Sequence, residues 1–103
     1  MTELYLVSVA GKFPNVDVQQ IDDVLNTAQD WLRLNGMTWL VWTNESGQAL
    51  ALRLKARLGP DDTILVLRVE PANPAGWAPE SVWNWLRGKI SHFSPKNALV
   101  RDR

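Results

Sequence analysis

The stretch Asp30–Thr43, Asp-Trp-Leu-Arg-Leu-Asn-Gly-Met-Thr-Trp-Leu-Val-Trp-Thr, decides the fold of this chain of 103 residues. Asn35-Gly36 stands between two apolar runs, and this dipeptide is the strongest short signal for a β-hairpin. A two-residue turn at that position fixes the register of the two strands, so that Trp31 faces Leu40. The alternative is that Trp31 and Leu32 extend a helix that precedes the hairpin.

The segments on either side of the hairpin supply the other elements of the fold. The apolar and polar patterns predict a strand over 4–10, a helix over 18–28 capped by Asp17, a helix after Asn44–Ser46 that ends at Gly59-Pro60, and a well-buried strand over 63–70. The order is β-α-β-β-α-β, which predicts an α+β protein of the ferredoxin-like type. In that fold an antiparallel sheet carries two helices on one face.

The C-terminal part of the chain adds one more helix. Pro79 and Glu80 are typical first residues of a helix, which we expect to continue to about Ile90 as the C-terminal helix of a single domain over 1–90. Residues 91–103 are predicted to be a basic, weakly ordered tail, in which Ala98–Val100 is compatible with a short edge strand.

Strand alternation divides the residues of the sheet between two faces. The face toward the helices is predicted to hold Tyr5, Val7, Val9, Leu32, Leu34, Met37, Trp39, Val41, Leu65, Leu67 and Val69. The second face would then hold Leu4, Leu6, Ser8, Trp31, Arg33, Thr38, Leu40, Trp42, Ile64, Val66 and Arg68. This second face is too apolar to be left in water, so something must cover it.

A second copy of the chain is the cover that we expect, because twofold symmetry buries the same apolar surface on both copies. The predicted homodimer interface consists of Leu6, Trp31, Leu40, Trp42, Ile64 and Val66. The third helix is an alternative cover for part of this face. Stacking of nucleic-acid bases on Trp31 and Trp42 is a further alternative.

Charge and composition limit the partners of the protein. The 11 Lys and Arg residues balance the 11 Asp and Glu residues, so there is no basic excess of the kind that drives general nucleic-acid binding. We expect nucleic-acid binding to be weak at most. The possible anion contacts are the cations of the C-terminal end, Arg87, Lys89, Lys96, Arg101 and Arg103.

The chain contains no cysteine, which excludes disulfides and thiolate metal sites. Its N-terminus has neither a basic leader segment nor an apolar run long enough to cross a membrane. These features predict a cytoplasmic protein that does not associate with membranes.

Four segments carry a resemblance to a known family: Tyr5-Leu-Val-Ser8, Thr38-Trp-Leu-Val41, Asp61-Asp-Thr-Ile-Leu-Val66 and Ala75-Gly-Trp77. They resemble the small bacterial ferredoxin-like proteins of the SinR family, which are distantly similar to the second universal CRISPR adaptation protein and to VapD-type and GhoS-type toxin–antitoxin components. The resemblance implies a homodimer. In the nuclease-like members of that wider group, an aspartate at the end of the first strand is taken to bind a divalent metal.

Ala10 stands at the position of that aspartate, and a methyl group cannot coordinate a hard cation. We therefore expect no catalytic residue, no cofactor and no metal site. The predicted function is that of a non-catalytic homodimeric binding protein, an antitoxin or an accessory factor of a nucleic-acid-linked system. One alternative is a divergent metal-dependent endoribonuclease that uses Asp17, Asp61 or Asp62, and another is a structural protein-interaction partner.

Other side chains with possible chemistry are predicted to have ordinary structural roles. The single histidine, His92, is expected to be a surface or partly packed residue. Asp22 and Asp23 fit the solvated side of a helix, and Asp61-Asp62 fits a turn. Arg53, Lys55 and Arg57 fit a solvated helix surface better than a phosphate-binding track.

Overall fold

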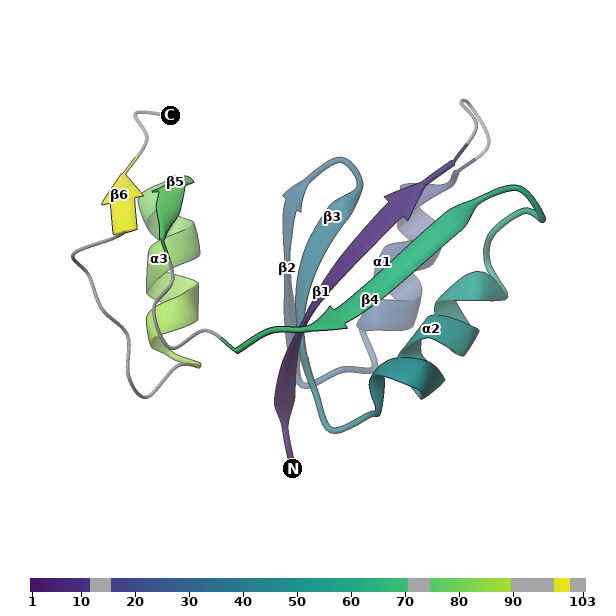
Figure 1. The fold of residues 1–103 in the computed structure, drawn as a ribbon, viewed down its shortest axis with the longest axis horizontal. Helices are drawn as coiled ribbons and strands as arrows, with labels where there is room; N and C mark the ends of the chain where they lie inside the picture. The colour runs from purple at the N-terminus through teal and green to yellow at the C-terminus, as the bar shows by residue number, and fades with distance from the viewer. Residues whose placement is uncertain (12–15, 71–74, 90–97, 101–103) are drawn as a thin grey trace. The chain divides into compact units, whose positions relative to one another are not determined.

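The computed structural model describes residues 1–11, 16–70, 75–89 and 98–100, and the chain divides into two compact units, Met1–Val69 and Glu70–Arg103. The first unit contains, in chain order, β1 (Glu3–Ala10), α1 (Val18–Leu25), β2 (Asp30–Asn35), β3 (Thr38–Thr43), α2 (Gly47–Lys55) and β4 (Thr63–Arg68) (Figure 1). The elements of this unit therefore follow one another in the predicted order, and the protein is of the α+β class.

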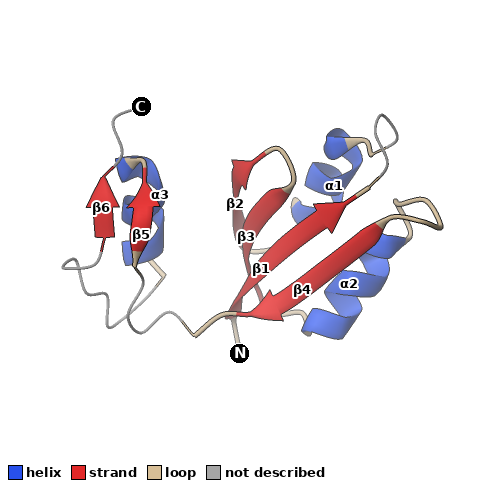
Figure 2. Ribbon diagram, turned by 45° about the horizontal axis from the view of Figure 1, so that its top comes forward, coloured by secondary structure: helices blue, strands red, loops and turns tan. Residues whose placement is uncertain are grey.

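The four strands of the first unit form one antiparallel sheet with the order β2-β3-β1-β4, so that β2 and β4 are its edge strands. Both helices of this unit lie on the same side of the sheet (Figure 2). Within the described ranges, no helix combines the length and the apolar character needed to cross a membrane.

The predicted caps start both helices. The Asp17 carboxylate accepts a hydrogen bond from the backbone N–H of Gln19 at 3.0 Å. The Ser46 hydroxyl accepts one from the backbone N–H of Ala49 at 3.1 Å. Each side chain satisfies a backbone donor that has no partner within its own helix. Because α1 ends at Leu25, the alternative in which the helix extends through Trp31 and Leu32 is wrong.

The core of the first unit lies between the sheet and its two helices. At its centre is Trp39, whose side chain is fully buried and whose indole N–H donates to the Asp22 carboxylate at 3.0 Å. The buried members of this core are Val7, Val9, Ile21, Val24, Leu25, Trp39, Val41, Leu50 and Leu54. Because β1, α1, β3 and α2 all contribute to it, burial of this cluster stabilises these four elements together.

The hairpin forms at the predicted place with a different register. Asn35 pairs with Thr38, so the two turn residues are Gly36 and Met37, and the register shifts between Arg33 and Asn35. Trp31 consequently faces Val41 instead of the predicted Leu40. A slip of one residue moves every side chain of a strand to the opposite face. The predicted positions of Trp31 on the outer face and of Leu32 on the inner face are therefore wrong.

The orientation of β4 also differs from the prediction. Val66 pairs with Val7 and Ile64 pairs with Val9, so both lie on the helix side, where they pack against the core. Leu65 and Leu67 lie on the opposite side and are each 53% exposed. The prediction of a well-buried strand is therefore wrong. Residues 64–67 are all apolar, and a run without alternation does not show which side faces the core.

The second unit consists of β5 (Gly76–Ala78), α3 (Glu80–Arg87) and β6 (Ala98–Val100). β5 and β6 pair in parallel, and the indole N–H of the buried Trp83 donates to the backbone C=O of Leu99 at 2.8 Å. The structure thus contains the third helix, which ends at Arg87 instead of about Ile90, and Ala98–Val100 is a strand that pairs with β5 in a separate two-stranded sheet. The predicted boundary between a domain over 1–90 and a tail over 91–103 lies outside the described residues.

Candidate functional site

The side of the sheet opposite α1 and α2 is the candidate site, and a row of leucines crosses it. Leu32 pairs with Leu40, Leu40 pairs with Leu6, and Leu6 pairs with Leu67. Directly opposed residues of an antiparallel sheet have their Cβ atoms about 5 Å apart, which is close enough for side-chain contact. The leucine row, Leu32, Leu40, Leu6 and Leu67, therefore contributes one leucine from each of the four strands.

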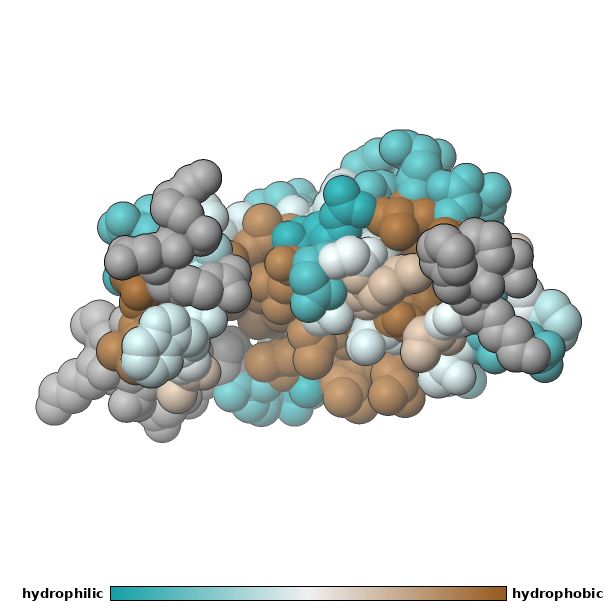
Figure 3. Space-filling model, turned by 90° about the horizontal axis from the view of Figure 1, so that it is seen from above, coloured by the Kyte–Doolittle hydropathy of each residue, from teal (hydrophilic) through white to brown (hydrophobic). Residues whose placement is uncertain are grey.

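The leucine row ends in exposed apolar surface on β4. Leu67, its last member, and Leu65, two residues earlier on the same strand face, are each more than half exposed. On the surface of the first unit, areas of apolar residues lie next to areas of polar residues (Figure 3). Neighbouring exposed leucines on one strand form apolar surface that favours contact with another protein surface.

The six residues predicted to form the dimer interface divide between the two faces. Leu6, Leu40 and Trp42 lie on the outer face, as predicted, because each alternates with a core residue of its strand. Trp31, Ile64 and Val66 pack against the core on the helix side, so their predicted place on the outer face is wrong. The sequence pattern did not indicate that Leu32, Leu65 and Leu67 lie on the outer face. They lie there instead of Trp31, Ile64 and Val66, which follows only from the registers of β2 and β4.

Two of the three carboxylates considered for metal-dependent catalysis, Asp17 and Asp62, have structural hydrogen bonds. Asp17 caps α1, and Asp62 accepts a hydrogen bond from the backbone N–H of Gly59 at 2.7 Å. Asp62 thus supports the turn that leads into β4, which is the role predicted for the Asp61-Asp62 pair. Ala10 is the last residue of β1. Within the part of the chain that the structure describes, no group of three His, Cys, Asp or Glu residues could hold a metal ion.

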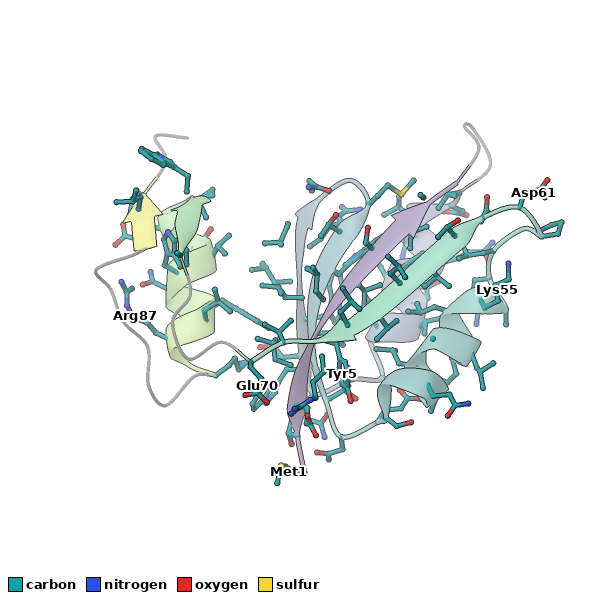
Figure 4. The ribbon with its side chains drawn as sticks, in the orientation of Figure 1. Met1, Tyr5, Lys55, Asp61, Glu70 and Arg87 are labelled. Atoms are coloured by element: carbon teal, nitrogen blue, oxygen red, sulfur yellow. The ribbon has the colours of Figure 1, made fainter. Side chains whose placement is uncertain are left out.

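The cations of α2 stabilise the fold of the first unit. The Arg53 guanidinium lies 3.0 Å from the Glu45 carboxylate and donates to the backbone C=O of Val24 at 3.1 Å. The Lys55 ammonium donates to the backbone C=O of Gly59 at 3.0 Å, at the end of the unit where Figure 4 labels Lys55 and Asp61. The prediction that Arg53 lies on a merely solvated helix surface is therefore wrong, since it links α2 to α1.

Two of the five predicted anion contacts are described, and both lie at the end of α3. The Arg87 guanidinium donates to the Asn84 side-chain carbonyl at 2.5 Å, and the Lys89 ammonium lies 5.0 Å from the centroid of the Trp85 ring. A cation at that distance interacts favourably with an aromatic face. The other three, Lys96, Arg101 and Arg103, lie outside the described residues, as does His92.

The side of the sheet opposite α1 and α2 is therefore apolar, its exposed part lies at Leu65 and Leu67 on β4, and Asp17, Asp62 and Arg53 have structural roles. Comparison with models of protein families, with curated proteins and with solved structures gives no match for this chain.

Proposed function

We propose that this protein is a non-catalytic binding protein that acts as a homodimer, in the role of an antitoxin or of an accessory factor of a nucleic-acid-linked system. The observation that carries the proposal is the leucine row, which ends in the exposed Leu67 with Leu65 beside it. Two copies that bring Leu65 and Leu67 together across a twofold axis remove the same exposed apolar surface from water on both copies.

The proposal includes a fold assignment. The strand order β2-β3-β1-β4, with both helices on one side, supports a ferredoxin-like sandwich and, with it, a relationship to the SinR-family proteins. The absence of a catalytic role is supported by Ala10 at the end of β1, by the helix-capping role of Asp17 and by the turn-supporting role of Asp62. Their carboxylates accept hydrogen bonds from backbone N–H groups that would otherwise lack acceptors.

Sedimentation equilibrium over the micromolar range tests the homodimer. We expect a dimer for the natural chain and at least a tenfold weaker association for Leu67→Glu, because the contact would desolvate a carboxylate. The matched control is Leu52→Glu on α2, since Leu52 is 66% exposed and its substitution should leave the association unchanged. A single monomeric species across this range would contradict the proposal.

A further inference from the structure

We propose that two copies of this chain join edge to edge through β4, so that their sheets form one continuous sheet with the twofold axis at Leu65. This inference rests on the proposed homodimer and specifies how its two subunits meet. In this arrangement the strand that pairs with the β4 edge is β4 of a second copy of the chain.

The backbone of β4 presents hydrogen-bonding groups at the edge of the sheet. β4 is the last strand in the order β2-β3-β1-β4, and the backbone N–H of Val69 donates to the C=O of Leu4 at 2.8 Å. Hydrogen-bonded positions alternate along an antiparallel pair, so the backbone groups of Leu65 and Leu67 also point toward β1. The backbone groups of Ile64, Val66 and Arg68 point away from β1, toward the open edge of the sheet. A second strand can pair with them at that edge.

The opposite edge of the sheet, β2, carries the features that prevent strand pairing, and β4 does not. β2 has a register irregularity between Arg33 and Asn35 and charged side chains at Asp30 and Arg33. Bulges and charges are the usual protection of an edge strand. β4, with the sequence Thr-Ile-Leu-Val-Leu-Arg, has neither proline nor glycine and only one charge, at its last residue. The β4 edge is therefore the one suited to pairing.

The charges that flank β4 favour an antiparallel pair of two copies. Asp61-Asp62 precedes the strand and Arg68 ends it, so an antiparallel arrangement brings Arg68 of each copy toward the acidic pair of the other. Opposite charges at facing positions stabilise a strand pair. Arg68 already lies 2.9 Å from the Glu3 carboxylate, and a guanidinium with five N–H donors can serve two carboxylates.

Charge also selects the register of that pair. With Leu65 facing Leu65 of the second copy, Arg68 faces Asp62 and Thr63 faces Leu67. If Val66 is on the axis instead, Glu70 faces Asp62 and two carboxylates oppose each other, which is unfavourable. The twofold axis is therefore placed at Leu65, and the exposed Leu65 and Leu67 side chains of both copies become neighbours on one face of the joined sheet.

The Leu65 register makes a geometric prediction that a cross-link can test. Residues facing each other at a non-hydrogen-bonded position have Cα atoms about 4.5 Å apart, which is within the range of about 4.4–6.8 Å that a disulfide spans. The natural chain has no cysteine, so a single substitution introduces the only thiol.

The experiment uses the full-length Leu65→Cys variant in a glutathione redox buffer at a concentration at which the natural chain sediments as a dimer. We expect most of the chain to become a disulfide-linked dimer on a non-reducing gel, while the control Leu52→Cys stays mainly monomeric there. Because Leu65→Cys also shortens a contact side chain, an equimolar mixture of Thr63→Cys and Leu67→Cys serves as a second probe of the same register. It should give a mixed disulfide.

A charge variant tests the contact between Arg68 and the acidic pair. Arg68→Glu should weaken the dimer at least tenfold, whereas Glu3→Gln, which removes the same internal ion pair without adding repulsion, should weaken it less than threefold. A dimer that sediments as such but yields neither cross-link would overturn the edge pairing and leave the proposed homodimer intact. A monomeric natural chain would overturn both.

Discussion

At the scale of single residues, Asp22 has a structural role that the sequence pattern does not indicate. The sequence places Asp22 and Asp23 together on the solvated side of a helix, and Asp23 is indeed exposed. Asp22 instead accepts the indole N–H of the fully buried Trp39 and lies 3.9 Å from the Arg33 guanidinium. Both partners are on the hairpin that follows α1, so the role of Asp22 depends on a register that the local sequence does not determine.

Replacing Asp22 should therefore cost more stability than replacing its neighbour. In Asp22→Ala the indole N–H of Trp39 loses its acceptor in a partly buried position, and the free energy of unfolding should fall by about 1–3 kcal/mol. Asp23→Ala, which removes only an exposed hydrogen bond from Gln19, should change it by less than about 0.5 kcal/mol. Urea denaturation followed by tryptophan fluorescence measures both. Equal losses in the two variants would contradict the role of Asp22.

At the scale of elements, the existence of each helix and strand in the first unit was predictable, and the registers of two strands were not. Caps such as Asp17 and Ser46 act over two or three residues, so they are visible in the sequence. The faces of β1 and β3 were also predictable, because Val7, Val9, Trp39 and Val41 alternate with residues of the outer face. In β2 the position of the hairpin turn determines which side chains face the core, and in β4 the pairing with the distant strand β1 determines it. The members Leu32 and Leu67 of the leucine row could therefore not be predicted.

The hairpin turn gives a prediction at this scale. The turn predicted at Asn35-Gly36 would require a positive φ at glycine, but among the described glycines only Gly76 has one. The Asn35 side chain instead accepts the backbone N–H of Met37 at 3.1 Å, and a Cβ on Gly36 would meet no atom within 4 Å. Gly36→Ala should consequently leave stability unchanged or raise it by up to about 1 kcal/mol, because it restricts the unfolded chain.

Gly76→Ala is the opposite case, since Gly76 has a φ of 151°, a conformation that side-chain-bearing residues rarely adopt. It should destabilise the second unit, and thermal unfolding followed by circular dichroism compares the two variants. A loss of more than about 1 kcal/mol in Gly36→Ala would indicate the left-handed turn after all.

At the scale of the whole molecule, the neutral total charge conceals an uneven distribution. The first unit carries eight carboxylates and six Lys or Arg side chains, while the second carries three carboxylates and five Lys or Arg side chains. A homodimer doubles the number of acidic and of basic side chains in each unit, so their ratio stays the same. The basic excess of the second unit is therefore offset within the same molecule, and cations such as Arg87 already have polar partners inside the chain.

We accordingly expect weak binding to duplex DNA or RNA, no tighter than the high-micromolar range near physiological salt. Each phosphate contact on duplex DNA contributes about −0.9 to the slope of log affinity against log salt concentration, and only a few contacts can form against this charge balance. Fluorescence anisotropy of a labelled duplex, titrated at several salt concentrations, measures both the affinity and the slope. Lys89→Ala should weaken this binding slightly, and Lys55→Ala, on the acidic first unit, should leave it unchanged. Nanomolar affinity would identify a nucleic-acid site instead, and the function would then have to be sought in the basic second unit.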